Sequence, residues 1–377
     1  MKPIRRPIYR EVLTSIALVA LGFLALFFFF DLVDELQYLG KNNGLAGDSI
    51  YQIRHALLYV ALLIPNHLYE LLPISVLIGS IFVMARLAQS SEYTILRTSG
   101  LGPWRALKLL LWLGAFFVAL SFVVGDYISP VSERAAQLLK ARYQSKITVG
   151  QTGAWLKEKQ ASSSFIVNVS ELSPDNEMHG VRIYEFDSKG LIVSSTEAPK
   201  AAFSSGTAWL LSNAMRTEFD VSASVNAAPQ QAKVSRSAVA SFRWPTEIST
   251  EMVSVALLRP DRMATIDLFN YIRHLEANGQ TSQRYEIEFW RKVFYPLSCL
   301  VMVMLALPFA YLHFRSGGIT AYVFGGVMAG ISFFLLNNVF GYAGNLQNWS
   351  PWLTAAAPGL IYSVLSLAAF GWLVLRR

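Results

Sequence analysis

The sequence predicts a membrane protein of mixed α and β structure, with six transmembrane helices and one all-β domain inserted after the third. Of its 377 residues, 53% are hydrophobic and only 15% are charged, which is unlike a water-soluble protein. Six apolar runs are long enough to span a bilayer core of about 30 Å, which needs about 20 helical residues. Between the third and fourth runs the sequence changes to short alternating segments.

The first three spans lie in the N-terminal part of the chain. Residues 12–30 contain no charged side chain and end in four phenylalanines. The second run, residues 56–85, is too long for one upright span, so we expect a short interfacial helix to end near Pro65, before the apolar stretch 71–85. Residues 109–125 form the third span. Together with the loops between them, these spans make up a first membrane part, residues 1–130.

The last three spans lie in the C-terminal part, residues 289–377. Residues 293–312 form the fourth span, in which Pro296 and Pro308 predict kinks. Residues 316–375 carry no ionised side chain, which is enough for two further spans. The stretch from Asn345 to Pro351 predicts the turn between them.

The basic residues predict the orientation of the spans. Residues 131–288 hold 17 basic and 17 acidic side chains, so the net charge of +7 belongs to the membrane parts. Their lysines and arginines gather at both chain ends and in loops that one topology places on the same side. By the positive-inside rule this side is cytoplasmic, so both termini are predicted inside and residues 131–288 outside. The charge therefore reflects topology rather than nucleic-acid binding, for which no motif is present.

The inserted domain, residues 131–260, is predicted to be all-β. Segments rich in β-branched and aromatic residues recur about every 8 to 12 residues, which is typical of an antiparallel sandwich or jelly roll. Residues 187–190 are the clearest hairpin turn. The predicted strands are residues 147–156, 164–170, 180–187, 191–196, 201–205, 207–213, 215–220 and 238–244.

A helical connector, residues 261–288, is predicted to join this domain to the fourth span. Thr265 is a suitable N-cap for a helix with Asp267 in its first turn, and Gly279 is suited to its C-terminal end. A second helix is predicted to run from about Gln280 into the fourth span.

The chain carries no combination of residues typical of an enzyme. It has no Gly-rich phosphate loop and no Gly-x-Ser-x-Gly motif, and its five histidines lack the spacing of metal ligands. We therefore expect no catalytic residue, metal or cofactor in this chain, and any ATP hydrolysis to take place in another chain.

The loop of residues 86–105 is the main candidate for contact with another protein. Ser90 or Ser91 can cap a short helix, and Glu92 lies in its first turn, where the helix dipole favours an acid. Two interpretations remain: a basic connector that lies on lipid headgroups, and a coupling helix that docks into a groove of a separate ATPase. The residues assigned to this contact are Ser90, Ser91, Glu92, Tyr93, Ile95, Leu96 and Arg97.

Two features inside the spans suggest further contacts. Gly326 and Gly330 form a small-xxx-small pattern that lets another helix approach closely, within the bundle or against a partner. Asp31 and Asp34 follow the apolar part of the first span, where acids are costly against lipid. They indicate either a wet or protein-lined cavity mouth or the outer headgroup zone.

Three stretches carry a family resemblance. They are the loop LAQSSEYTILRTSG, the strand entry QTGAWLKEKQ, and the connector RPDRMATIDLFNYIRHLEANGQTSQRYEIEFWRKVFYPLS with the span after it. They resemble the LptF/LptG permeases of Gram-negative bacteria, and the LptG branch most closely, over essentially the whole chain. The resemblance implies six spans with a periplasmic β-jellyroll after the third. It also implies a permease subunit that extracts lipopolysaccharide from the outer leaflet of the inner membrane and passes it to a periplasmic bridge of jellyroll proteins.

The resemblance also implies the partners. These are a homologous LptF-like permease, a cytoplasmic ATPase dimer that holds ATP and magnesium, and an LptC-like bridge protein whose single transmembrane helix inserts beside the first span. The loop around Glu92 corresponds to the coupling helix, and the first and fifth spans of both permeases correspond to the walls of the lipid cavity. The chain would lie in the bacterial inner membrane, with residues 131–288 in the periplasm.

One departure from the family concerns the lipid headgroup. Family members can carry a lysine near the outer end of the first span, where it can contact lipid phosphate, and alignment on the Val33-Asp34 dipeptide places Asp31 there. A carboxylate cannot make this contact, so we expect Lys41 and Arg54, or basic residues of the partner permease, to replace it. The residues assigned to the cavity and the headgroup are Phe27, Phe30, Asp31, Asp34, Lys41 and Arg54.

Two other classes of function stay open. One is a permease of the same general kind that moves another lipid or lipoproteins, which would copurify with an ATPase but without lipopolysaccharide. The other is a membrane scaffold for a periplasmic assembly, in which substitution of Glu92 would leave function intact.

Overall fold

The computed structural model describes residues 2–40, 50–90, 103–144, 153–160, 163–173, 177–204, 208–220, 233–256, 260–311 and 319–372. The chain divides into two compact units. A helical unit contains Met1–Gln37, Ala56–Glu133 and Gln283–Arg377, and a second unit contains Tyr38–His55 and Arg134–Ser282. The predicted combination of apolar helices and a β-rich domain is confirmed.

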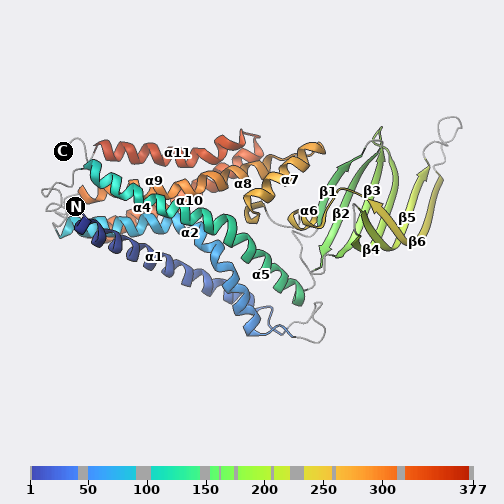
Figure 1. The fold of residues 1–377 in the computed structure, drawn as a ribbon, viewed down its shortest axis with the longest axis horizontal. Helices are drawn as coiled ribbons and strands as arrows, with labels where there is room; N and C mark the ends of the chain where they lie inside the picture. The colour runs from blue at the N-terminus through green and yellow to red at the C-terminus, as the bar shows by residue number, and fades with distance from the viewer. Residues whose placement is uncertain are drawn as a thin grey trace. The chain divides into compact units, whose positions relative to one another are not determined.

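Long apolar helices run side by side in the helical unit (Figure 1). Within the described residues, six helical stretches are long and apolar enough to cross a membrane, as predicted. The helices of this unit are α1 (Lys2–Leu36), α2 (Ile53–Gln89), α4 (Pro103–Val123), α8 (Gln283–Phe294), α9 (Ser298–Ala306), α10 (Ile319–Leu346) and α11 (Pro351–Phe370).

The helix α2 is continuous, so the prediction of a separate interfacial helix that ends near Pro65 was wrong. Both Pro65 and Pro73 lie inside this one helix. A proline removes one backbone hydrogen bond from a helix. Neighbouring helices can offset this loss in a membrane protein, and 83% of the residues in the most apolar stretch of α2 are buried.

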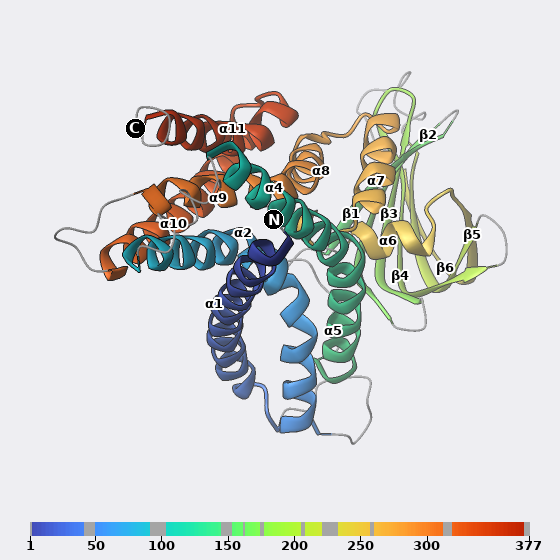
Figure 2. The ribbon, with the colours of Figure 1, turned by 60° about the vertical axis from the view of Figure 1, so that its left-hand side comes forward.

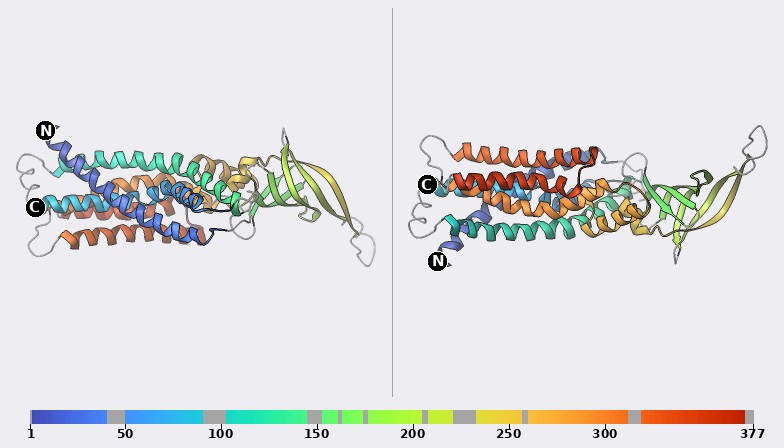
Figure 3. Two further views of the ribbon diagram at one scale, coloured as in Figure 1. Left: turned by 90° about the horizontal axis from the view of Figure 1, so that it is seen from below. Right: turned by 90° about the horizontal axis from the view of Figure 1, so that it is seen from above.

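The core of the helical unit surrounds α2, whereas α1 and α10 lie at its margins. Only 11% and 22% of the residues in their most apolar stretches are buried. Figure 3 shows α1 crossing the other helices obliquely. The fully buried side chains of this core include Val12, Ile16, Val76, Leu77, Ile81, Leu110, Met302 and Phe333.

The helix of the fourth span changes to 3-10 geometry at both prolines where kinks were predicted. A 3-10 turn, Tyr295–Leu297, contains Pro296 and separates α8 from α9. A second 3-10 turn, Leu307–Tyr311, follows α9 and contains Pro308.

The third helical run is longer than the predicted span, which ended at residue 125. After α4 the chain passes through a π-helix, Val124–Ile128, into α5 (Ser129–Gln144). Residues of α5 that were assigned to the β domain are therefore helical. The predicted helix ended too early because α5 has a more polar composition than the span before it.

The second unit contains one six-stranded antiparallel sheet with the strands in chain order (Figures 1 and 2). The alternation of buried and exposed side chains, as in β1, places one face of the sheet on a core. Trp209 is fully buried in this core, and its indole nitrogen donates to the Ile248 carbonyl over 2.7 Å. The strands are β1 (Ala154–Lys159), β2 (Ser163–Leu172), β3 (Glu177–Asp187), β4 (Ile192–Ser204), β5 (Ala208–Asp220) and β6 (Lys233–Pro245).

Two predicted strand breaks are continuous strand instead. The strand β4 runs through Pro199, which has no pairing partner on either neighbouring strand. The strand β5 runs through Asn213, whose φ of 52° makes a local irregularity between paired residues. The predicted hairpin turn is confirmed, since Asp187 Oδ1 accepts from the amides of Lys189 and Leu191, both over 2.8 Å.

The segment after the sheet is helical. Its first helix, α6 (Thr250–Ala256), packs on β1 and β2 and lies within the residues predicted to be all-β, so that prediction was wrong there. The predicted connector contains the helix α7 (Thr265–Ala277), which follows a 3-10 turn (Pro260–Arg262). Ala264 is the N-cap of α7, so the prediction of Thr265 in that role was wrong by one residue. Gly279 has a φ of 62° after the end of α7, which is the conformation expected there.

Candidate functional site

The unexpected acid of the first span has a basic partner. Asp31 Oδ2 lies 2.7 Å from His67 Nε2 on α2, and the two side chains are 25% and 18% exposed. The Phe27 ring contacts the His67 ring, with 4.9 Å between their centroids. The carboxylate and the imidazole therefore join the C-terminal part of α1 to α2.

The other residues assigned to the cavity are more exposed. Phe30 is 55% exposed and Asp34 is also exposed, so this part of α1 presents both apolar and acidic groups. Arg54 is exposed at the start of α2. Lys41 lies outside the described residues.

The helical unit contains a second polar cluster, which was not predicted from the sequence. Lys292 of α8 is 8% exposed, and its Nζ donates to the Gly125 carbonyl in the π-helix over 3.2 Å. The Lys292 ammonium also lies over the Tyr69 ring, and the Tyr295 hydroxyl donates to the Glu70 carbonyl over 2.5 Å. The signal in the sequence was the basic pair directly before the uncharged run of the fourth span.

The neighbouring Arg291 joins α8 to α10. Its Nη1 donates to Glu288 Oε1 over 2.8 Å, and its Nη2 donates to Asn338 Oδ1 over 3.4 Å. Arg291 and Lys292 therefore bind the N-terminal part of the fourth span to α10 and to the π-helix.

Close helix contacts in this unit depend on glycines. A Cβ on Gly326 would lie 2.6 Å from Ile81 Cδ1, and one on Gly330 would lie 3.0 Å from Ile74 Cγ2. Both glycines of the small-xxx-small pattern therefore face α2 within the bundle. A third close contact, of Gly79 on α2, brings α2 against the α1 backbone at Ile16.

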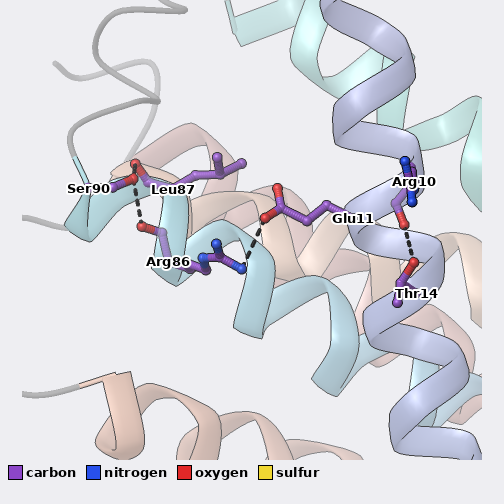
Figure 4. A network of polar contacts seen from close by, with 6 residues as sticks. All are labelled: Arg10, Glu11, Thr14, Arg86, Leu87 and Ser90. Atoms are coloured by element: carbon purple, nitrogen blue, oxygen red, sulfur yellow. Dashed lines mark hydrogen bonds and ion pairs between the residues drawn. The ribbon is translucent and has the colours of Figure 1, made fainter.

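The N-terminal part of α1 and the C-terminal end of α2 are linked by one ion pair (Figure 4). Arg86 Nη1 lies 3.1 Å from Glu11 Oε1. Ser90 follows α2, and its hydroxyl donates to the Arg86 carbonyl over 3.1 Å. The remaining residues assigned to ATPase contact, Ser91, Glu92, Tyr93, Ile95, Leu96 and Arg97, lie outside the described residues.

The second unit has a polar cavity of about 630 Å³ beside α7. Its lining includes the buried Glu158, which accepts hydrogen bonds from Thr246 Oγ1 and the Glu247 amide. Burial lowers the pKa of His274 in the same lining, and the nearby Glu158 carboxylate opposes this shift. Asn278 Oδ1 accepts from the Lys159 amide over 2.7 Å, which ties the end of α7 to β1.

The described residues show two further features of the helical unit and of the chain as a whole. They contain no group of three or more His, Cys, Asp or Glu side chains that could hold a metal ion. The helical unit instead leaves the apolar faces of α1 and α10 largely uncovered, with charged groups near the C-terminal end of α1.

Comparison with known proteins gives one consistent result. Residues 6–375 match the family model described as lipopolysaccharide export system permease LptF/LptG. The chain is 27% identical to the lipopolysaccharide export system permease protein LptG of Escherichia coli K12, over 99% of this chain and 98% of that protein. It is 24% identical to the LptG protein of Haemophilus influenzae, with the same coverage of each chain. Because the family model covers nearly the whole chain, this multi-pass membrane protein belongs to the LptF/LptG family of lipopolysaccharide export permeases.

Proposed function

We propose that this chain is a permease subunit of an ATP-driven transporter that extracts lipopolysaccharide from the bacterial inner membrane and passes it to a periplasmic jellyroll bridge. The observation that carries the proposal is the family match over residues 6–375. In this proposal the chain moves the lipid, and a separate cytoplasmic ATPase dimer binds ATP and magnesium.

The uncovered faces of α1 and α10 are the proposed walls of the lipid cavity. Their low burial is what a helix needs if it faces lipid acyl chains or a partner subunit. A second, LptF-like permease would supply the opposite walls, and the single helix of an LptC-like bridge protein would pack beside α1. Phe27 and Phe30 would then contribute apolar surface near the mouth of the cavity.

The headgroup contact is assigned to Lys41 and Arg54. Asp31 cannot attract a lipid phosphate, and its partner His67 is already engaged with it over 2.7 Å. Arg54 is exposed at the start of α2, where its guanidinium can bind phosphate with two hydrogen bonds. A charge-assisted hydrogen bond contributes about 1.5–3 kcal/mol, so loss of such a contact should weaken lipid stimulation by about tenfold or more.

The coupling to ATP hydrolysis is assigned to the loop of residues 86–105, with Glu92 as its central acid. Both termini and this loop would lie in the cytoplasm, and residues 131–288 would lie in the periplasm. This orientation is supported by the arginines and lysines at the chain ends and in the loop.

The test is purification of the chain with its natural partners from membranes, followed by mass spectrometry of both the proteins and the bound glycolipid. We expect an ATPase, a second permease and lipopolysaccharide in one complex. A complex with an ATPase but a different lipid or a lipoprotein would point to the other permease class. Absence of any ATPase would contradict the transport function.

Two sets of variants then separate the assigned contacts. Glu92→Ala should reduce the ATPase activity of the reconstituted complex, whereas Glu276→Ala, which removes an exposed acid of α7, should not. The double variant Lys41→Ala/Arg54→Ala should lose stimulation by lipopolysaccharide and keep basal ATPase activity. Unchanged stimulation would exclude these two residues as the headgroup contact.

A further inference from the structure

A short apolar groove lies between α1 and α4, away from the proposed lipid cavity residues. Its volume is about 400 Å³, and it is lined by Tyr9, Leu13, Trp112, Leu113 and Phe116. Trp112 and Phe116 are 69% and 55% exposed, while Leu113 is buried at the base. The Tyr9 hydroxyl donates to the Leu109 carbonyl over 3.1 Å, so α1 and α4 are bound to each other where the groove begins.

Two basic side chains lie near residues that line this groove. Lys108 is exposed one helical turn before Trp112 on α4, which places both side chains on the same helix face. Arg10 is exposed three residues before Leu13 on α1. Glu11 extends from α1 toward Arg86 of α2 (Figure 4), and Arg10 lies about 100° around the α1 axis from it. The two cations therefore lie on the same helix faces as Leu13 and Trp112, which line the groove from two different helices.

We propose that this groove binds an anionic phospholipid of the cytoplasmic leaflet. The acyl chain would lie against Trp112 and Phe116, and the phosphate would lie between Arg10 and Lys108. Charge complementarity supports this occupant, because an exposed cation lies about one helical turn before Leu13 on α1 and another lies one turn before Trp112 on α4, toward the N-terminal end of each helix. Each basic side chain near a membrane surface favours anionic lipid by about fivefold, so the pair should give a preference of about thirtyfold.

The size of the groove argues against a transmembrane helix as its occupant. Its walls extend from Tyr9 to Leu13 and from Trp112 to Phe116, which is about one helical turn on each side. A partner helix that crosses the bilayer would need an apolar strip along about 20 residues. An acyl chain can instead enter a short groove and continue into the surrounding lipid.

The test is native mass spectrometry of the intact purified complex after removal of endogenous lipid. Phosphatidylglycerol and phosphatidylethanolamine with identical acyl chains are added separately, and the retained lipids are counted. We expect Arg10→Gln/Lys108→Gln to weaken retention of one phosphatidylglycerol by about thirtyfold and to leave phosphatidylethanolamine retention unchanged. The double variant Arg182→Gln/Lys200→Gln removes two exposed cations from the sheet and is the matched control.

A variant of the groove lining provides the second measurement. Trp112→Ala should weaken both phospholipids equally, because it removes acyl-chain contact and no charge. The proposal is overturned if Arg10→Gln/Lys108→Gln behaves like the control. It is also overturned if lipopolysaccharide displaces the bound phosphatidylglycerol, or if a photo-cross-linking residue at position 112 captures a protein helix in place of lipid.

Discussion

The contact between α1 and α2 predicts a large effect of one added methyl group at Gly79. A Cβ at this position would lie 2.7 Å from the Cα, N and Cγ1 atoms of Ile16, whereas ordinary contacts begin at 3.4 Å. The helices must therefore separate by about 0.7 Å in Gly79→Ala. Overpacking of this kind costs about 1–3 kcal/mol, and the higher helix propensity of alanine offsets about 1 kcal/mol of this cost. We expect a net loss of up to about 2 kcal/mol in the free energy of unfolding.

Gly22→Ala is the matched control, since nothing lies within 4 Å of a Cβ at that position on α1. It should be neutral or slightly stabilising. The measurement is denaturant unfolding of the full chain in mixed micelles, together with the lipid-stimulated ATPase activity of the reconstituted complex. Ile16→Ala should not rescue Gly79→Ala, because two of the three atoms in contact belong to the backbone. Equal stability of Gly79→Ala and Gly22→Ala would refute the reasoning.

Further predictions concern contacts of both units. The pair formed by Asp31 and His67 should show a coupling free energy of about 1 kcal/mol in a double-mutant cycle of alanine variants, and additive losses would mean that the contact is not formed. Gly326→Ala should lower the free energy of unfolding, and the second substitution Ile81→Val should restore it, because valine lacks the Cδ1 atom that the new Cβ meets. If Ile81→Val does not restore stability, the strain lies elsewhere. Burial lowers the pKa of His274 below its unfolded value of 6.5, so the folded unit binds fewer protons and loses stability as the pH falls below 6.5 toward the folded pKa. Hydrogen exchange of α7 at about pH 5.5 and about pH 7.5 should detect this loss in the full chain, and His274→Gln should abolish the difference.

The six spans could be predicted because a long uncharged run can adopt few conformations in a membrane. A chain segment in lipid must satisfy its own backbone hydrogen bonds, so such runs become helices. Breaks were harder to predict. Pro65 indicated a helix end, but packing around α2 keeps the helix continuous through it. The strand breaks predicted after residues 196 and 213 do not form, since pairing on both sides of Pro199 and of Asn213 carries each strand across.

The site was predictable only where one residue gave the signal. Asp31 could be assigned to the site because an acid directly follows an apolar span. Its partner His67 could not be predicted, because it lies 36 residues away and only the packing of α1 on α2 brings the two side chains together. Lys292 went unnoticed because it lies directly outside the uncharged run, and its acceptor is a backbone carbonyl that no side-chain pattern can reveal.

The π-helix Val124–Ile128 changes the angular position, around the helix axis, of every residue after it. One additional residue in a helical turn rotates every later side chain by about 100° around the axis. In the present phase, the Ser129 hydroxyl donates to Asn66 Oδ1 over 3.0 Å and the Ser132 hydroxyl donates to the Leu62 carbonyl over 2.6 Å. Removal of one residue from this turn would carry both hydroxyls away from α2 without changing either serine. The length of the turn, more than the identity of its residues, therefore determines which face of α5 meets α2.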